Sequence, residues 1–316
     1  MHQFSVITPT YNRANYLIKV HDCLCNQGDI DLEWVIIDDG STDDTKKTVL
    51  ELGNKIPIQY VYQENGGQVS AWNTGLQYTN SHITLKMDDD DILLPNVLEK
   101  VWSYFDLNTD RFEHGCVGLS GLCRYENGNI IGKKFPRDYF ISDYIRYIKN
   151  KKIIGDKCDF FVTSISKMYP FPIMPGEKNI APSIIYLRIS QNYKTIYINE
   201  LFQEKKFLLG GLSSINYWIL YPQGSELYCN EAAMPPMCIK LQIKYSGEYI
   251  FYSRLNKRKN IFKNAKNKVI FPLGLFAYFI LRIKYFLKQF ILLQKINNKI
   301  KSKFRGKNYS KIIQSE

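Results

Sequence analysis

The sequence lacks a cysteine pattern that would hold a metal or a disulfide framework. It has seven cysteines, an odd number without regular spacing, in 316 residues. Cys23 and Cys25 form a C-x-C pair that no second pair matches, and the chain contains no Cys/His zinc pattern. We therefore expect reduced thiols, as in a cytoplasmic protein.

We expect neither a leader nor a membrane-spanning segment. Met1, His2 and Gln3 lead straight into strand-like residues, so we expect no signal peptide. The longest uncharged apolar run extends from Val269 to Leu281. It is shorter than the roughly 20 residues that a helix needs to cross the hydrocarbon core.

Acidic residues are nearly absent from the last fifth of the chain. Residues 254–316 carry 17 Lys or Arg and one acid, Glu316. Residues 1–253 therefore hold 25 bases and 29 acids, so the body has a charge near −4 and the tail one near +16. A tail of this charge predicts an anionic partner, either nucleic acid or a lipid surface.

The apolar residues of the tail favour the lipid surface. The stretch 274–296 is strongly apolar, has a narrow stripe of lysines and lies between basic flanks. This pattern is typical of a helix that lies in the membrane interface. No nucleic-acid reader motif is present, so we expect no nucleic-acid partner. The alternative is a pair of core helices packed on the rest of the protein.

Strand-like and helix-like segments alternate in the first third of the chain. This alternation predicts a parallel α/β sheet, and ligands of such sheets bind beyond the carboxyl ends of the strands. A polar loop falls at each of four such ends, as a nucleotide site requires. The expected strands are 4–8, 33–37, 58–62 and 82–87, and the polar loops are 8–12, 38–41, 64–67 and 88–91.

Four consecutive carboxylates, Asp88 to Asp91, follow the last of these strands. Adjacent negative charges repel one another and are costly in a packed fold unless a cation lies among them. Mg²⁺ and Mn²⁺ take oxygen ligands, and Mg²⁺ is usually held by one or two carboxylates plus substrate phosphates. The stretch therefore predicts a metal site against a diphosphate. A solvated acidic turn is the alternative.

The motifs TPTYNR, IDDGSTDDT, ENGGQVSAWNTGL and MDDDDILLP, in this order over residues 4–95, resemble the N-terminal half of family 2 glycosyltransferases. The resemblance implies a GT-A fold, an α/β architecture with a mostly parallel sheet flanked by helices. It also implies inverting transfer from a nucleotide-diphosphate sugar. Residues 155–157 and 175–178 further resemble a subset that builds bacterial capsular and surface polysaccharide, as do 186–189 and 210–213.

The same resemblance implies a division of the chain. We expect a GT-A domain over residues 1–230, with a nucleotide-binding half at 1–105 and an acceptor-side half at 106–230. A basic helical region, 231–316, would follow and associate with the cytoplasmic face of the inner membrane, where a lipid-linked glycan acceptor would be found.

The resemblance also assigns roles to residues. Tyr11 would stack on the nucleotide base, Asp39 would accept the uracil imide proton, and Asp90 would hold Mn²⁺ or Mg²⁺. The alternatives are a core aromatic for Tyr11 and a helix cap for Asp39, and the run of four Asp leaves the register open by one residue. The expected nucleotide-binding residues are Thr8, Pro9, Tyr11, Asp39, Gly67, Asn73, Asp88 and Asp89, and Asp90 is the expected metal ligand.

The general base is the position where this sequence departs from the resemblance. An inverting reaction needs a base for the acceptor hydroxyl. Related surface-polysaccharide enzymes have a carboxylate where this chain has Pro182, which cannot accept a proton. Three hypotheses follow: Glu177 is the base, another acid such as Asp156 or Asp159 is the base, or the enzyme is slow or inactive. We favour Glu177.

The sequence therefore predicts a metal-dependent inverting glycosyltransferase that moves a sugar from a UDP-type donor to a glycan acceptor, lipid-linked in our reading. The second hypothesis is a catalytically inactive nucleotide-sugar-binding partner of a glycan assembly complex, motivated by Pro182. A nucleotidyltransferase is the third. That class would have a Gly-rich phosphate loop near the N-terminus, and Thr8 to Arg13 does not contain one.

Overall fold

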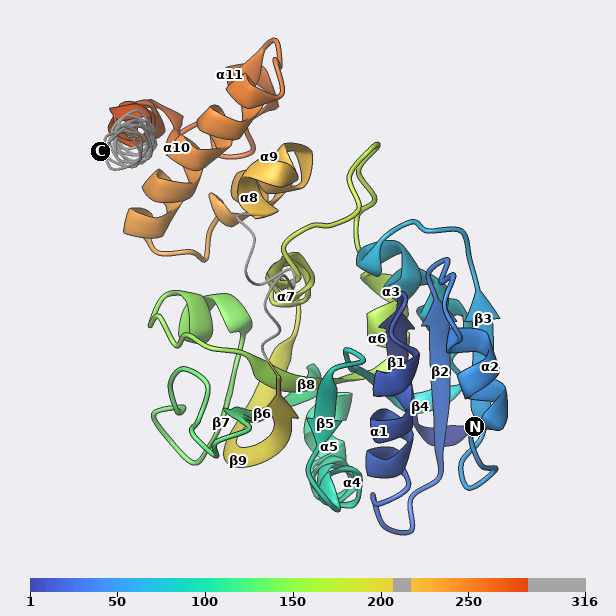
Figure 1. Cartoon of the computed structure of the whole chain (residues 1–316). Coiled ribbons are helices and arrows are strands. Elements are labelled where there is room, and N and C mark those ends of the chain that lie inside the picture. The colour runs from blue at the N-terminus through green and yellow to red at the C-terminus, as the bar shows by residue number, and fades with distance from the viewer. Residues whose placement is uncertain (207–216, 284–316) are drawn as a thin grey trace, which may run out of the picture.

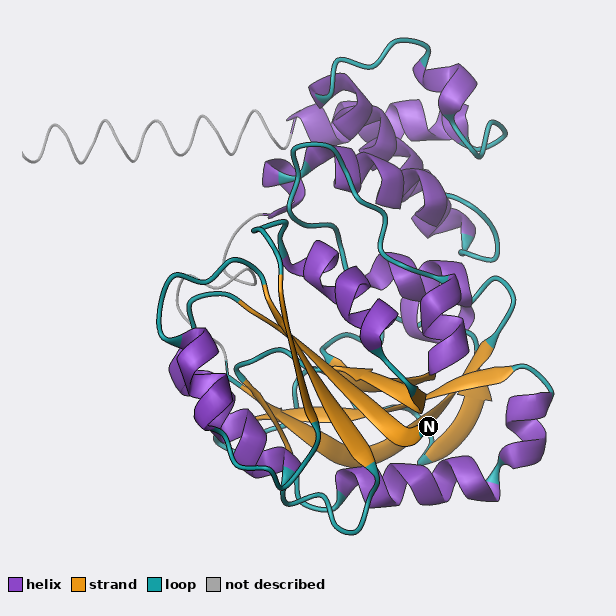
Figure 2. Ribbon diagram, turned by 90° about the vertical axis from the view of Figure 1, so that its right-hand side faces the viewer, coloured by secondary structure: helices purple, strands orange, loops and turns teal. Residues whose placement is uncertain are grey.

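The computed structural model describes residues 1–206 and 217–283. Over these residues the chain forms one sheet with helices on both faces and a group of C-terminal helices beyond one of those layers (Figures 1 and 2). The predicted motif at 210–213 and the tail from residue 284 lie outside the described residues. The strands of the described part are β1 (His2–Thr10), β2 (Leu32–Asp38), β3 (Ile58–Tyr62), β4 (Ser81–Lys86), β5 (Asp91–Leu93), β6 (Cys116–Tyr125), β7 (Tyr139–Ser142), β8 (Lys157–Val162) and β9 (Lys194–Lys205).

The helices fall into two sets: those of the first 190 residues and those of the C-terminal group. Those of the first 190 residues are α1 (Ala14–Leu24), α2 (Thr45–Glu51), α3 (Gln68–Tyr78), α4 (Val97–Leu107), α5 (Thr109–Glu113), the π-helix η1 (Tyr144–Lys149), α6 (Thr163–Met168) and α7 (Ser183–Ile189). The C-terminal group contains α8 (Tyr217–Leu220), α9 (Pro222–Ala232), α10 (Ile239–Leu255), α11 (Ile261–Asn264) and a helix over 271–283.

The N-terminal half of the sheet is parallel, in the order β3-β2-β1-β4. Each of the four predicted strands is present, and β3 has the predicted bounds. Helix α1 begins at Ala14 without a side-chain cap. Its first N–H group is instead satisfied by Asp43 of the β2–α2 loop, because the Ala14 N–H donates to Asp43 Oδ2 at 3.2 Å. The N–H of Asn12 also donates to Ser41 Oγ at 2.8 Å, and this bond joins two of the predicted polar loops.

The second half of the sheet is mixed. Antiparallel β8 joins β4 to β6, and β6 pairs parallel with β9. Short strand β5 returns from the aspartate stretch to pair antiparallel with β9. The predicted halves 1–105 and 106–230 therefore share one sheet. Helix α4 begins two residues after Pro95, and the residue before it, Asn96, has the left-handed conformation.

Alternating strand residues build a separate apolar core on each face of the sheet. Val6, Trp34 and Ile36 face the layer of α1, α2 and α4, whereas Ile7 and Val35 face α3, α6 and α7. The strands are buried on both faces, as parallel strands in α/β proteins are. Such burial leaves the strand ends as the place where polar side chains meet.

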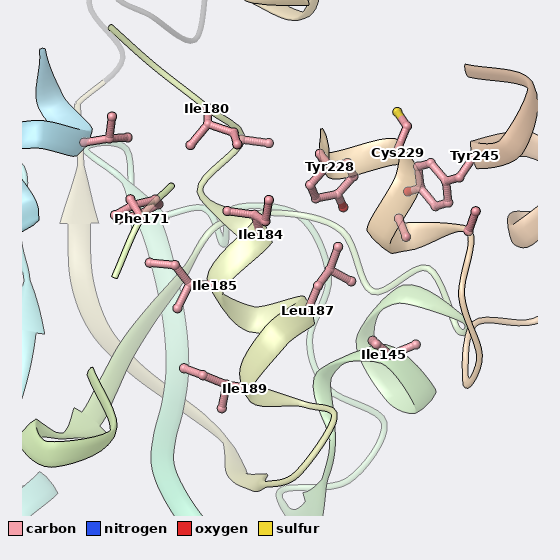
Figure 3. Close-up of a cluster of buried hydrophobic side chains, with 14 of the residues drawn as sticks. Ile145, Phe171, Ile180, Ile184, Ile185, Leu187, Ile189, Tyr228, Cys229 and Tyr245 are labelled. Carbon is pink, nitrogen blue, oxygen red and sulfur yellow. The ribbon is translucent and has the colours of Figure 1, made fainter. Parts of the chain in front are cut away.

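Helices α9 and α10 extend the core on the face of the sheet that α3, α6 and α7 cover. Tyr228 and Cys229 of α9 and Tyr245 of α10 lie in one buried cluster with Leu187 of α7 and Ile145 of η1 (Figure 3). The predicted boundary near residue 230 falls within α9. Among the described helices, none is both long and apolar enough to cross a membrane.

Candidate functional site

A cavity of about 890 Å³ opens beside the carboxyl end of β4. Its lining joins the two halves of the sheet, because it includes residues that follow β4, residues of β6 and β8, and residues of η1, α7 and α10. Asp88 and Asp90 line it together with Gln68 and Trp72 of α3. The cavity is therefore the place where the predicted aspartate motif meets the acceptor-side half.

The four aspartates do not all face the same way. Asp88, Asp90 and Asp91 line the cavity. Asp89 is only 5% exposed and turns toward the first loop, where it accepts hydrogen bonds from Thr10 Oγ1 at 2.8 Å and Arg13 Nη1 at 2.7 Å. The spacing that faces the cavity is thus Asp88-x-Asp90, the register used for the sequence prediction.

A cation accompanies each carboxylate, as the repulsion between four adjacent charges requires. Arg13 Nη1 bridges Asp89 and Asp90, at 3.0 Å from Asp90 Oδ2. Lys86 pairs with Asp88 and Lys205 with Asp91. The structure therefore distributes three cations among four carboxylates, so that part of the negative charge stays available at the cavity.

The pKa values of the aspartates follow from this arrangement. Burial raises the pKa of Asp89 to about 6, opposed by Arg13 and Thr10. Burial likewise raises the pKa of Asp91 to about 7, against the attraction of Lys205. Burial also tends to raise the pKa of Asp88, but the attraction of Lys86 and Lys205 outweighs this effect, so the pKa is lowered. Asp88 is thus ionised at neutral pH, in the state that an oxygen ligand of a metal requires.

The donor set facing the cavity fits a hard divalent cation. Asp88 and Asp90 supply carboxylate oxygens, and Mg²⁺ is usually bound by one or two carboxylates plus substrate phosphates. Within residues 1–206 and 217–283, no group of three or more His, Cys, Asp or Glu side chains is placed to hold a metal without a substrate.

The predicted base-binding residues of the first loop lie at the same edge of the sheet but outside the cavity. Thr8 and Pro9 are buried within β1, and Thr8 Oγ1 accepts a hydrogen bond from Trp34 Nε1 at 2.9 Å. Tyr11 lies on the loop and is 49% exposed. Of the three, Tyr11 is the side chain that solvent, and hence a nucleotide base, can reach.

Asp39 organises the third predicted loop. Its carboxylate accepts hydrogen bonds from the backbone N–H groups of Gly66 and Gly67, both at 2.8 Å, and from Gln63 Nε2 at 2.7 Å. The side chain is 4% exposed. It does not cap the helix that follows Ser41, because α2 begins at Thr45 with Asp44 in the N-cap position.

Gly67 and Asn73 hold the segment between α6 and α7 against the N-terminal half. Gly67 has φ +90°, and a Cβ there would lie 2.3 Å from the carbonyl oxygen of Lys178. Asn73 brackets the backbone of Phe171, donating from Nδ2 to its carbonyl and accepting its N–H at Oδ1, each at 2.8 Å. The close approach that Gly67 allows is thus to this segment of the chain.

Glu177 is not brought to the cavity. Its two carboxylate oxygens accept the backbone N–H groups of Gln223 and Gly224, at 2.7 and 2.8 Å, in the first turn of α9. This places the negative charge at the positive end of the helix and satisfies two of its free N–H groups. The geometry gives Glu177 a role in fastening α9, and its assignment as the base stays a prediction from the sequence.

Pro182, by contrast, does line the cavity, at the start of α7. Besides the aspartates that follow β4, the carboxylates lining the cavity in the described part of the chain are Asp156 and Asp159. Asp156 is exposed, whereas Asp159 is half-buried on β8. Burial raises the pKa of Asp159, and the hydroxyl groups of Ser120 and Tyr186 oppose that rise.

Four further residues complete the site, and sequence reasoning did not assign them. Arg13 belongs to the first motif, and the need of four carboxylates for a cation is the signal that points to it. Gln68 Nε2 donates to Asp88 Oδ1 at 2.7 Å. Lys205 lies 114 residues from Asp91, a separation for which the sequence contains no signal. Lys149, between aromatic rings, also lines the cavity.

Comparison with known proteins agrees with this geometry. Residues 5–166 match the family described as glycosyl transferase family 2. An uncharacterized glycosyltransferase of Rickettsia bellii is 33% identical over 138 residues, which are 42% of this chain and 20% of the relative. A chondroitin synthase of Escherichia coli is 35% identical over 134 residues, 42% of this chain and 19% of that one. The matched part of the chain thus spans less than half the length of these curated relatives.

Solved structures show the fold. S. aureus TarS 1-349 superposes with a TM-score of 0.61 at 18% identity, over 87% of this chain and 78% of that chain. Its complex with UDP-GlcNAc gives 0.63 at 19% identity, over 87% and 79% of the two chains. The predicted GT-A fold is confirmed. With the family match extending over half of its length, the chain belongs to glycosyl transferase family 2.

Proposed function

We propose that this glycosyltransferase is a metal-dependent inverting hexosyltransferase that uses a UDP-sugar and builds a bacterial capsular or surface polysaccharide. The observation that carries the proposal is the Asp88-x-Asp90 pair, which faces a cavity at the carboxyl end of a parallel strand, with cations beside it. A nucleotide diphosphate needs a counter-charge and an anchor at the same place. Support for a uridine donor comes from the S. aureus TarS complex with UDP-GlcNAc, which has the same fold.

Asp90, with Asp88, would hold Mn²⁺ or Mg²⁺, which would neutralise charge on the diphosphate as it leaves. The chain's own residues would do the rest of the donor work. Arg13 orients Asp90 through its guanidinium, and Gln68 orients Asp88. Tyr11 would stack on the base. Asp39 would act on the nucleotide through the turn that it holds in place.

We propose Asp159 as the general base. It lines the cavity with the aspartate pair, and burial raises its pKa, which brings a carboxylate closer to the pKa that proton transfer at neutral pH favours. It would accept the proton of the acceptor hydroxyl while that oxygen bonds to the anomeric carbon and the bond to the diphosphate breaks. Pro182 lines the same cavity at the position where an acid was expected.

The second candidate function is a catalytically inactive partner that binds a nucleotide sugar within a glycan assembly complex. The observation in its favour is again Pro182, because the cavity wall at the start of α7 lacks a carboxylate there. Donor binding without transfer to any acceptor would support this candidate.

We propose the cytoplasmic membrane surface as the location. In the helix over 271–283, Gly274 packs against Ser246 and Gly247 of α10, so one face is docked. On the outward side, Leu273, Phe276 and Ile280 are 52%, 71% and 42% exposed. Their spacing of three and four residues makes an apolar stripe, and residues 254–283 contain eight Lys or Arg and no acid. An anionic lipid headgroup layer complements both features.

The first test of the donor site is calorimetric titration of UDP into the full chain, with Mn²⁺ and then with EDTA. We expect binding that EDTA abolishes. Asp90→Ala should remove the metal-dependent part, and Asp106→Ala, which changes an aspartate at the end of α4 away from the cavity, should not. UDP binding that is indifferent to both EDTA and Asp90→Ala would refute the metal assignment.

A further inference from the structure

Five lysines line the cavity in addition to the cations paired with the aspartate stretch. Lys149 ends the π-helix η1, Lys152 follows it, and Lys157 begins β8. Lys206 follows β9, and Lys244 comes from α10. Segments far apart in the sequence thus bring positive charge to one cavity wall.

Two of these lysines have carboxylate partners and three do not. Lys206 pairs with Glu126 at 3.3 Å, and Lys244 with Glu248 at 3.6 Å. Among the described residues, no carboxylate forms an ion pair with Lys149, Lys152 or Lys157. The ammonium group of Lys157 instead lies near backbone carbonyl oxygens, the nearest that of Gly155 at 3.2 Å. Asp156 and Asp159, which line the same cavity, attract the ammonium group of Lys157 without forming an ion pair with it. Within the described residues, none of the three ammonium groups is therefore held by a carboxylate at ion-pair distance.

The backbone of η1 positions Lys149. The N–H of Asn150 donates to the carbonyl of Ile145 at 3.0 Å, a bond across five residues that is typical of a π-turn. Such turns are frequent at functional sites. The ammonium group lies 5.6 Å from the ring centroid of Tyr144 and 5.5 Å from that of Tyr228. Lys149 is thus held between two aromatic rings at the cavity wall.

The charges around Lys149 leave its ammonium group undercompensated. Burial, with Lys244 nearby, lowers the pKa of Lys149 to about 8, although Cys229 and Glu248 act in the opposite direction. Burial raises the pKa of Cys229 well above its usual value, so this thiol is neutral and brings no negative charge. Glu248 is already paired with Lys244. An anion entering the cavity would restore the balance.

The unpaired lysines and the candidate base, Asp159, lie in the same cavity and are linked by aromatic contacts. The rings of Tyr144 and Tyr186 lie 5.3 Å apart, and Tyr186 acts on Asp159 through its hydroxyl group. Asp159 and Lys149 line the same cavity. A ligand held at the lysines is therefore in the chamber where its hydroxyl group would meet the base.

We propose that Lys149, Lys152 and Lys157 form the acceptor subsite and that the acceptor is an acidic glycan, one that carries carboxylate or phosphate groups. The inference rests on the proposed transferase function, since it names the substrate class of the same cavity. A neutral glycan would leave Lys149 and Lys157, which are partly buried, without an ion-pair partner, whereas an acidic one would form charge-assisted hydrogen bonds with them and with the exposed Lys152.

The test uses two pairs of oligosaccharides titrated into the full chain at pH 7. One pair is a hyaluronan hexasaccharide and its carboxyl-reduced form, and the other is maltohexaose phosphate and maltohexaose. We expect one acidic member to bind about tenfold more tightly than its neutral counterpart, as the loss of roughly one charge-assisted hydrogen bond predicts. The pair that discriminates identifies the anion.

Substitutions of Lys149 test whether this residue causes the preference for the acidic ligand. Lys149→Gln should weaken the acidic ligand about tenfold. Lys149→Arg, which keeps the charge, should retain binding, and Lys47→Gln on the exposed face of α2 should have no effect. Equal affinity within both pairs, no binding of any of the four ligands, or an acidic ligand indifferent to Lys149→Gln would each overturn the proposal.

A parallel titration with UDP separates this inference from the donor assignment. Absence of UDP binding together with Lys149-dependent binding of an acidic glycan would overturn the UDP donor and leave the acceptor subsite in place. Intact UDP binding without discrimination between acidic and neutral glycans would do the reverse.

Discussion

The two sides of the cavity treat charge differently. On the proposed donor side, Asp89 and Asp90 share Arg13, and Asp91 has Lys205. On the acceptor side, Lys149 has aromatic rings rather than a carboxylate beside it. The first arrangement compensates charge within the protein, and the second leaves charge for a ligand to compensate.

The difference indicates how much of the binding energy depends on the charge of each substrate. A donor site with charges paired in advance is preorganised, and it needs only a metal and the diphosphate to complete it. The acceptor side has positive charge without partners and Pro182 in place of a carboxylate at the start of α7. Its binding energy would therefore come from the ligand's own charge. The following predictions test this contrast, from the largest expected effect to the smallest.

Replacing the candidate base should have the largest effect. Asp159→Asn should lower kcat by about 10²–10⁴, the contribution of a general base, while the Kd for UDP stays unchanged because the donor side is intact. The measurement is UDP release from UDP-sugars in the presence of an acidic oligosaccharide, together with calorimetry of UDP.

Glu177→Gln is the matched comparison. An amide in place of the carboxylate weakens the hold on the Gln223 and Gly224 N–H groups, so we expect a lower Tm with kcat little changed. If Glu177→Gln abolished turnover and Asp159→Asn did not, the prediction from the sequence would be right and our assignment of the base wrong.

The contact of Gly67 with the segment between α6 and α7 should be sensitive to one added methyl group. Gly67→Ala places a Cβ 2.3 Å from the Lys178 carbonyl at φ +90°, so we expect a loss of about 3 kcal/mol in the free energy of unfolding from overpacking and backbone strain. Denaturant titration measures it. Gly128→Ala is the control, because Gly128 has φ +83° with no atom within 4 Å of the added Cβ. Equal losses in the two variants would show that the contact with Lys178 is unimportant.

The affinity for an acidic glycan should depend on pH through Lys149. Its pKa of about 8 means that the free protein loses the ammonium charge as the pH rises through 8, whereas a bound anion favours the charged form. Binding above pH 8 must then take up a proton, so we expect affinity to fall about tenfold between pH 7 and pH 9.

The variant Lys149→Arg isolates this titration from that of the surrounding groups. Arg stays charged over the whole range, so the affinity of this variant should change little between pH 7 and pH 9. Titration calorimetry at the two pH values measures both proteins. A decline of equal size in the variant would assign the pH dependence to another group of the wall, such as Lys157, whose pKa burial also lowers.

The smallest effect is expected at the outward stripe of the C-terminal helix. Phe276→Glu adds a negative charge to an apolar face, so binding to vesicles containing anionic lipid should weaken about threefold to tenfold, roughly the loss of one side chain's burial and one charge. Leu50→Glu changes a side chain that is 73% exposed on α2, and it serves as control. Vesicle sedimentation that is equal for both variants and the parent would exclude this face as the membrane contact.

Local patterns were sufficient to predict much of the donor side. The strands and the polar loops at their ends depend on residues near one another in the chain, because hydrophobic periodicity and strand polarity are local properties. The acceptor side was less predictable. Glu177 fastens α9 through a contact with a residue 46 positions away, which no short-range pattern contains.

The sequence by itself determined the family, the order of the strands and the edge of the sheet at which a nucleotide sugar would bind. Tertiary structure alone decided which aspartates face the cavity, which cations accompany them and which lysines line the opposite wall. Lys205 reaches Asp91 across 114 residues, and Lys149 enters the wall through the packing of η1 against α7 and α9. Periodicity specifies which face of a strand or helix is buried, whereas pairing between distant charges depends on how those faces pack together.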